Sequence, residues 1–137
     1  MHILVTGATA GIGQATAQAL AAMGHTVLVH GRSAEKCRRT IAAIQAAVPG
    51  ASCVPVVCDL SSLDAVRSLA ARLRQHPLDV IIHNAGVFKR QPTRTVDGFE
   101  TTWAVNHLAP FLLTHLLLDH LLTLSLIHIS EPTRQPC

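Results

Sequence analysis

A glycine-rich turn near the N-terminus is the feature that most constrains the fold of this chain. The apolar run at residues 2–5 leads into Thr6-Gly7-Ala8-Thr9-Ala10-Gly11-Ile12-Gly13, and an alanine-rich stretch follows. This order predicts a strand, a tight turn and a helix. Such a turn directs backbone N–H groups and the positive end of the helix dipole at one point, which suits a dinucleotide pyrophosphate.

Each glycine of the turn has a steric role in this interpretation. We expect Gly7 to let the chain turn off the strand, Gly11 to leave room for a phosphate, and Gly13 to let the helix pack closely. The spacing is G-x-x-x-G-x-G. Glycine-rich turns occur in many folds, so a turn without a ligand is the alternative interpretation of this segment taken alone.

Composition predicts one domain with an aliphatic core. The chain has 137 residues, of which 49% are hydrophobic and only 3% aromatic. Such a core is typical of helices packed on a parallel sheet. The net charge of +3 is small, and aromatic residues for base stacking are few. These features argue against a nucleic-acid partner.

Cysteine, histidine and hydropathy patterns exclude other classes. The four cysteines form no C-x-x-C pair and the nine histidines no H-E-x-x-H cluster, so we expect reduced thiols and no metal site. The chain begins with a predicted strand rather than a secretion signal, which favours a cytoplasmic protein. The apolar segment 110–129 contains Asp119 and three histidines, so we expect a helix that does not span a membrane.

Apolar runs alternate with helical segments along the chain, as in repeated β-α-β units. The predicted strands are residues 2–6, 26–30, 53–57 and 80–84, and the predicted helices are 12–23, 34–48 and 63–74. Ser33 and either Ser61 or Ser62 suit N-caps, and Asp97 with Glu100 has capping-box spacing before a longer helix that reaches residue 122. The predicted fold is α/β, a Rossmann-type doubly wound parallel sheet of about four strands with helices on both faces, in one domain over residues 1–123.

Four motifs in this order resemble those of the short-chain dehydrogenase/reductase family. They are the glycine turn, Asp59-Leu60 after the third strand, His83-Asn84-Ala85-Gly86 after the fourth, and Asn106 in the next helix. The family usually has Asn where this chain has His83. The segment 99–118 resembles the retinol-dehydrogenase-like branch in particular.

The resemblance implies an oxidoreductase that transfers a hydride between a nicotinamide cofactor and a small alcohol or carbonyl substrate. It implies that Asn106 holds a water in the catalytic system. The implied cofactor-binding residues are Thr6, Gly7, Thr9, Ala10, Gly11, Ile12, Gly13, Asp59, Leu60, Asn84, Ala85 and Gly86. Judged alone, Asp59 also suits a turn or helix cap, and residues 84–86 suit a tight strand exit.

The end of the second strand predicts NADP(H) rather than NAD(H). An NAD site usually has a carboxylate there, whereas this chain has His30-Gly31-Arg32-Ser33. The guanidinium of Arg32 suits a 2′-phosphate. The alternative is an ordinary loop cation, and Ala10 stands where many NADP-dependent relatives have a basic residue.

The family's catalytic Ser, Tyr and Lys are absent from these residues. The chain has no tyrosine, and its lysines, Lys36 and Lys89, are not in a Y-x-x-x-K motif. We therefore expect the 137 residues to lack hydride-transfer activity. We also expect an unpaired edge at residues 80–84, and a homo-oligomer of the intact protein through Leu112, Leu116 and neighbouring leucines.

Two alternatives to the enzyme remain open at this point. One is a non-catalytic dinucleotide-binding sensor on the same fold, and the other is a sugar-nucleotide epimerase, against which the glycine spacing counts. Residues 124–134 resemble the in-frame translation of a transposase sequencing-library adapter. Under that interpretation residues 124–137 form a non-native tail; the alternative is a genuine short strand at 124–129.

Overall fold

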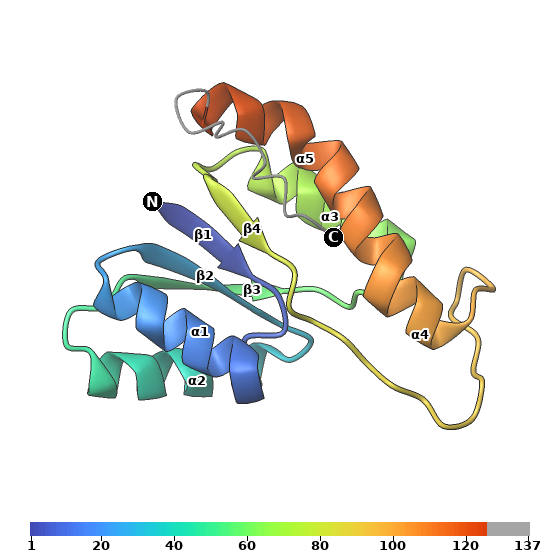
Figure 1. The fold of residues 1–137 in the computed structure, drawn as a ribbon, viewed down its shortest axis with the longest axis horizontal. Coiled ribbons are helices and arrows are strands. Elements are labelled where there is room, and N and C mark those ends of the chain that lie inside the picture. Colours follow the sequence, from blue (N-terminus) through green and yellow to red (C-terminus); the bar gives the residue numbers. More distant parts are fainter. Residues whose placement is uncertain (126–137) are drawn as a thin grey trace, which may run out of the picture.

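Four parallel strands form the centre of the computed structural model, which describes residues 1–125 (Figure 1). They are β1 (His2–Val5), β2 (Thr26–Gly31), β3 (Cys53–Val57) and β4 (Val80–Ile82), in the spatial order β3-β2-β1-β4. Each predicted strand is present, and the doubly wound parallel sheet is confirmed. Most of the predicted tail, residues 126–137, lies outside the described residues.

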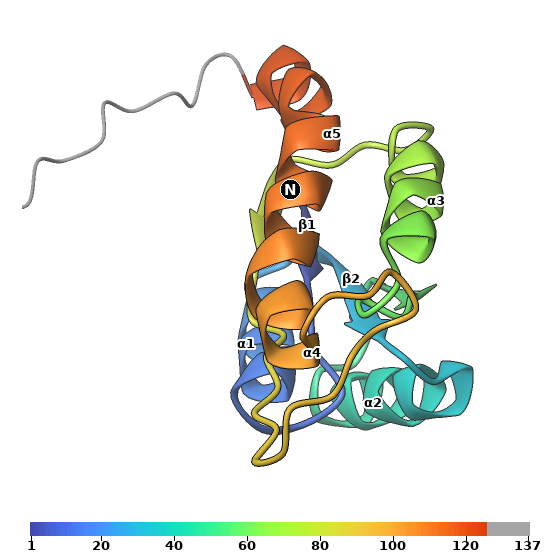
Figure 2. The same cartoon turned by 90° about the vertical axis from the view of Figure 1, so that its right-hand side faces the viewer.

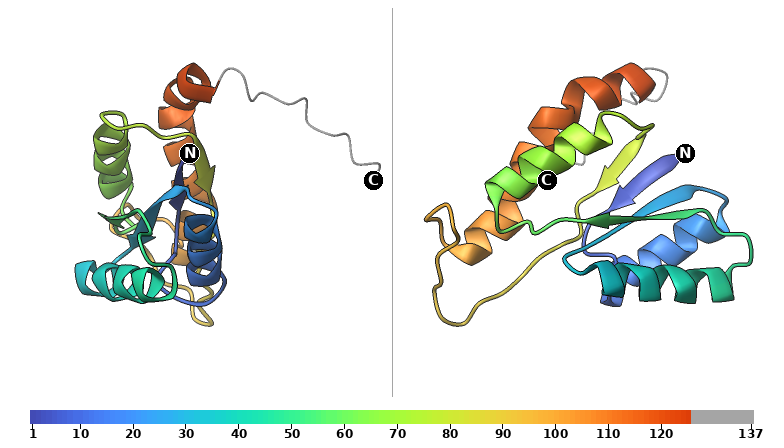
Figure 3. Two further views of the ribbon diagram at one scale, coloured as in Figure 1. Left: turned by 90° about the vertical axis from the view of Figure 1, so that its left-hand side faces the viewer. Right: turned by 180° about the vertical axis from the view of Figure 1, so that it is seen from behind.

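Helices cover both faces of the sheet. Helices α1 (Gly11–Ala22) and α2 (Ala34–Ala47) lie on one face, and α3 (Leu63–Leu73) and α5 (Ala109–Ser125) lie on the other (Figure 3). Figure 2 shows α3 and α5 side by side, and their residues are in contact. This arrangement follows from right-handed β-α-β crossovers.

Strand alternation divides the core into two clusters. Ile3 and Val5 of β1 point toward α1 and α2, whereas Leu4 points toward α3 and α5. The cluster on the side of α3 and α5 includes Leu113 and Leu117 of α5, both fully buried. Because successive strand side chains point to opposite faces, a sheet buried on both sides needs continuous apolar runs such as residues 2–5.

Two predicted N-caps are confirmed. The Ser33 hydroxyl accepts a hydrogen bond from the Lys36 N–H at the start of α2, and the Ser62 hydroxyl accepts one from the Ala65 N–H at the start of α3. Each bond satisfies an N–H group that has no partner within its helix.

The predicted start of the longer helix is wrong. α4 (Thr101–Trp103) begins after Glu100, whose carboxylate accepts a hydrogen bond from the Trp103 N–H at 2.7 Å. The Asp97 carboxylate instead accepts one from the Leu63 N–H at the start of α3. Gly98 has a φ of +83°, which turns the chain between the two acidic residues and prevents the capping box.

A π-helical segment interrupts the longer helix. α4 continues through η1 (Ala104–Leu108) into α5, and Asn106 lies in the π-helical part. The side chains of Leu112 and Leu116, which we expected at a subunit interface, are half-buried against the core. Large apolar side chains that stay exposed on this helix are Trp103, Phe111 and Leu118. Self-association of this helix stays a prediction.

β4 is shorter than predicted because a side chain replaces the strand partner beyond Ile82. The Thr6 hydroxyl accepts hydrogen bonds from the N–H groups of Asn84 and Ala85, each at 3.0 Å. The Thr6 N–H still donates to the Ile82 carbonyl at 3.0 Å. The chain therefore leaves the sheet at residue 83 and runs beneath the glycine turn.

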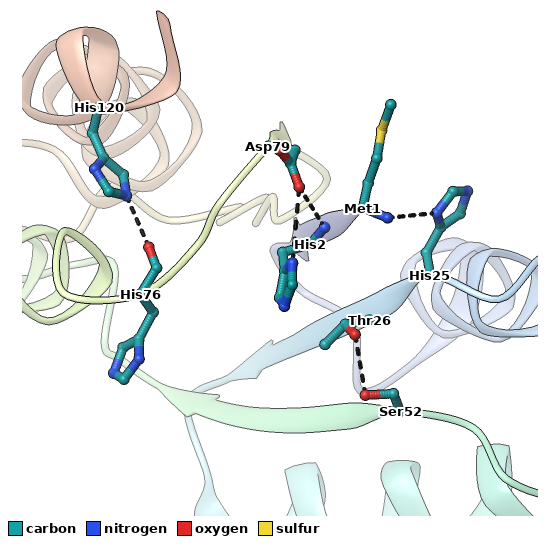
Figure 4. A network of polar contacts seen from close by, with 8 residues as sticks. All are labelled: Met1, His2, His25, Thr26, Ser52, His76, Asp79 and His120. Carbon is teal, nitrogen blue, oxygen red and sulfur yellow. Dashed lines mark hydrogen bonds and ion pairs between the residues drawn. The ribbon is translucent and has the colours of Figure 1, made fainter. Parts of the chain in front are cut away.

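Polar contacts tie the amino ends of the strands together (Figure 4). The Asp79 carboxylate accepts a hydrogen bond from the His2 N–H at 2.7 Å, the Met1 amino group lies 3.2 Å from His25 Nδ1, and His120 Nε2 donates to the His76 carbonyl. Within residues 1–125, no group of three or more His, Cys, Asp or Glu side chains is placed to hold a metal ion. None of the helices in that range has the length and apolarity needed to cross a bilayer.

Candidate functional site

A cavity of about 450 Å³ opens at the carboxyl ends of the strands, at the other end of the sheet from the contacts in Figure 4. Ligands of open parallel sheets bind at this edge, where the order of the strands reverses. Here the reversal falls between β1 and β4, which are neighbours although three helices separate them in the chain. Nine of the predicted cofactor-binding residues line the cavity: Gly7, Thr9, Ala10, Arg32, Asp59, Leu60, Asn84, Ala85 and Gly86.

The glycine turn requires glycine at three positions. Gly7 and Gly11 have φ values of +62° and +55°, in the left-handed region that side chains disfavour. A Cβ on Gly7 would lie 2.8 Å from the Ala85 Cα, and a Cβ on Gly13 would collide with the Gly7 carbonyl and the Asn84 amide. At Gly11 a Cβ would meet nothing within 4 Å, so this glycine leaves open space beside the turn.

Thr6 and Asn84 join the glycine turn to the segment after β4. The Asn84 side-chain amide donates to the carbonyls of Thr6 and Gly7, each at 3.1 Å. The Thr6 hydroxyl lies below, where it accepts from two N–H groups of the β4 exit. These contacts hold the two turns next to each other, as the predicted crevice requires.

Not every N–H group of the turn is free for a ligand. The Gly7 N–H donates to His30 Nδ1 at 2.9 Å, and the Ala8 N–H donates to the His30 carbonyl at 2.8 Å. The N–H groups at the start of α1, from Gly11 to Gly13, remain for an anion because the first turn of a helix has no internal acceptors. The expected anion site therefore lies at the helix start rather than at the strand end.

Arg32 and Asp59 bring opposite charges to the rim of the cavity. Hydrogen bonds from the Ser61 hydroxyl and N–H lower the pKa of the Asp59 carboxyl, and the Arg32 charge contributes in the same direction. Asp59 thus forms the turn that its alternative interpretation predicted, and it also faces the cavity. The exposed Arg32 side chain makes no hydrogen bond or ion pair with any residue of the described part.

Five predicted site residues do not line the cavity: Thr6, Gly11, Ile12, Gly13 and Asn106. Thr6 and Gly13 are buried beneath the turn, whereas the Ile12 side chain is 79% exposed beside it. The Asn106 carboxamide accepts from the Val87 N–H and donates to the Val87 carbonyl, each at 2.8 Å. Asn106 therefore holds the segment that follows β4.

Sequence reasoning assigned no role to His30. Its side chain is only 2% exposed, and its Nε2 lies 2.9 Å from the Cys58 carbonyl. Burial lowers the pKa of His30, and the hydrogen bond to Cys58 partly offsets this. The available signal was a single imidazole at the end of an otherwise apolar strand. The other cavity residues outside the predicted cofactor-binding set are Gly31, Ser61, Val87, Lys89, Thr101 and Val105; of these, only Val87 and Lys89 belong to a segment, residues 87–94, that the sequence placed beside the pocket.

Buried thiols and His83 complete the electrostatics of the site. Burial raises the pKa of Cys58 to about 11 and also raises the pKa of Cys37 and Cys53, so these thiols are uncharged at neutral pH. Burial lowers the pKa of His83, whose Nε2 lies 2.7 Å from the Thr114 hydroxyl. His83 therefore connects the β4 exit to α5.

Curated relatives of the chain are oxidoreductases. Retinol dehydrogenase 13 of Homo sapiens is 40% identical over 121 residues, which cover 87% of this chain and 37% of the relative. Protochlorophyllide reductase A of Arabidopsis thaliana is 43% identical over 126 residues, which cover 88% of this chain and 31% of the relative. The chain thus spans about a third of the length of these relatives.

Solved structures agree with the fold. A metagenomic short-chain oxidoreductase, crystallised in complex with NADP, superposes with a TM-score of 0.76 at 34% identity, and the match covers 90% of this chain and 57% of the other. A family model described as short chain dehydrogenase matches residues 1–127. The chain belongs to the short-chain dehydrogenase family.

Proposed function

We propose that this chain binds NADP(H) and forms the cofactor-binding part of an oxidoreductase that acts on a small alcohol or carbonyl substrate. The glycine turn carries the proposal. Gly11 leaves open space beside a helix start whose N–H groups lack internal acceptors, and the cavity begins at the same turn. A pyrophosphate is the ligand group that this combination suits best.

The other cavity residues fit the remaining parts of a dinucleotide. Asp59 and Leu60 after β3 suit the adenine end, and residues 84–86 after β4 suit the nicotinamide end because small side chains allow close approach. The bound cofactor would donate or accept the hydride. Asn106 acts on this site by holding the backbone of Val87, which lines the cavity.

The relatives support the substrate class. Retinol, named in one of them, is an alcohol, and this relative shares 40% identity with the chain. The family resemblance of the four motifs supports the same chemistry. We propose an alcohol or carbonyl substrate for the intact protein on these grounds.

Arg32 supports NADP(H) as the preferred cofactor. The Arg32 side chain lines the cavity at the end of β2, and within residues 1–125 it makes no hydrogen bond or ion pair that a ligand would have to displace. A guanidinium in this position can form charge-assisted hydrogen bonds with a 2′-phosphate. The complex of the metagenomic relative with NADP supports the same preference.

Isothermal titration calorimetry of the chain with NADP⁺ and with NAD⁺ tests the proposed cofactor preference. We expect NADP⁺ to bind about tenfold or more tightly, since charge-assisted hydrogen bonds contribute about 1.5–3 kcal/mol. Arg32→Ala should remove that difference. Arg38→Ala, which changes an exposed arginine of α2 that does not line the cavity, is the control. Equal affinities for both cofactors, unchanged in Arg32→Ala, would overturn the preference.

A further inference from the structure

We propose that His30 is a positioning residue for cofactor binding: in its neutral form, with the proton on Nε2, it holds the glycine turn in the shape that accepts the pyrophosphate. This inference rests on the proposed function of the same site. It adds a residue and a protonation state that the family motifs do not include.

Three hydrogen bonds place His30 at the junction of three turns. Its Nδ1 accepts from the Gly7 N–H at 2.9 Å, and its carbonyl accepts from the Ala8 N–H at 2.8 Å. Its Nε2 donates to the Cys58 carbonyl at 2.9 Å. One residue thereby fixes the turn after β1 to the end of β2 and to the turn after β3, and all three line the cavity.

These partners allow only one protonation state. A backbone N–H can only donate, so Nδ1 must be an acceptor; a carbonyl can only accept, so Nε2 must carry the proton. In the imidazolium form Nδ1 would also carry a proton and would face the Gly7 N–H. The Gly7 hydrogen bond would then be lost, and a donor would point at a donor in a buried place.

The surroundings of His30 favour the neutral form. The side chain is buried, and desolvation lowers its pKa. The carbonyl that accepts the His30 hydrogen bond belongs to Cys58. The thiol of Cys58 is neutral because burial raises its pKa to about 11. The charged groups on the neighbouring turns are Arg32 after β2, Asp59 after β3 and Lys89 after β4, all at the rim of the cavity. Burial, rather than any of these charges, is what lowers the pKa of His30.

Gly7 transmits the effect to the cofactor. It has a left-handed φ of +62°, and Ala85 lies so close that a Cβ on Gly7 would be 2.8 Å from the Ala85 Cα. In this tight turn the Gly7 N–H has His30 Nδ1 as its acceptor. The N–H groups at the start of α1 lie only four residues further along the same turn. Loss of the His30 contact therefore changes the position of the donors that would bind the pyrophosphate.

Titration of the chain with NADP⁺ at about pH 7.5 and about pH 5 tests the inference, because one coupled proton weakens binding by up to about tenfold per pH unit. His30→Asn is the matched variant: its Oδ1 replaces the Nδ1 acceptor but does not titrate. We expect wild type to lose about tenfold more affinity than His30→Asn over this interval. Titration of the 2′-phosphate affects both proteins and cancels in the comparison.

Two further readouts keep the outcomes distinct. Nitrogen NMR of the imidazole should show the Nε2–H tautomer without cofactor, and the Nδ1–H tautomer would overturn the inference. If His30→Asn does not fold, His30→Gln, which keeps the donor to Cys58 but loses the acceptor for Gly7, should bind more weakly than wild type at about pH 7.5 with a flatter pH profile. Parallel profiles of variant and wild type overturn the role of His30, whereas no binding by wild type at any pH overturns the proposed function itself.

Discussion

Single residues fix the close contact between the glycine turn and the β4 exit beside the cavity. Gly13 shows this most clearly, because its Cβ position is taken by the Gly7 carbonyl and the Asn84 side-chain amide. The sequence pattern predicted that Gly13 allows close packing. The structure adds that the close neighbours are the turn itself and the β4 exit, which no periodicity in the sequence could identify.

Gly13→Ala should destabilise the fold by about 1–3 kcal/mol, since a methyl group forced against backbone overpacks the site. At an ordinary helical position the same change stabilises the protein by about 1 kcal/mol. The sign of the change in the free energy of unfolding therefore distinguishes a crowded position from an ordinary one. Urea unfolding followed by circular dichroism measures the effect. Gln14→Ala, at the next position of α1, is the control and should shift the free energy of unfolding by less than about 0.5 kcal/mol. A more stable Gly13→Ala would contradict the geometry described here.

The sequence predicts the role of a residue where that role depends on the residue's own backbone conformation or on a neighbour in the chain. It does not predict the role where the partners are distant in the sequence. The glycines of the turn and the caps at Ser33 and Ser62 belong to the first kind. His30 belongs to the second kind: its three hydrogen bonds reach residues 7, 8 and 58, which only the folded sheet brings together.

At the scale of helices and strands, local signals set most boundaries to within one residue. The exceptions are informative. β4 ends early because the Thr6 hydroxyl takes over as acceptor, and the fourth helix starts late because Gly98 turns the chain after Asp97. The first departure arises from a tertiary contact beside the cavity, and the second from a local turn together with the hydrogen bond between Asp97 and the Leu63 N–H. The other elements follow hydrophobic periodicity and capping.

α3 depends on its N-cap, so Ser62→Ala should lower the stability of the protein by about 1 kcal/mol. The Ser62 hydroxyl is the acceptor for the Ala65 N–H, and alanine leaves that group without a partner. Thermal unfolding provides the measurement, and Ser68→Ala in the exposed middle of α3 is the matched control. Equal melting temperatures for the two variants would show that the cap contributes nothing measurable.

At the scale of the whole molecule, the two ends of the sheet carry different kinds of contact. At the amino ends, backbone and histidine contacts join strands and helices (Figure 4). At the carboxyl ends, the turns after all four strands surround one cavity. The sequence predicted the crevice at the carboxyl ends, because parallel strands bring the residues that follow each strand to the same edge.

Gly11 and Gly24 provide the most direct test of the glycine turn as the pyrophosphate site. Both have positive φ values and open space at the Cβ position, but Gly24 lies at the far end of α1. Gly11→Ala and Gly24→Ala should therefore cost similar stability, about 1–2 kcal/mol each. Titration with NADP⁺ should show wild-type affinity in Gly24→Ala and a loss of about tenfold or more in Gly11→Ala. Equal affinities in the two folded variants would contradict the account.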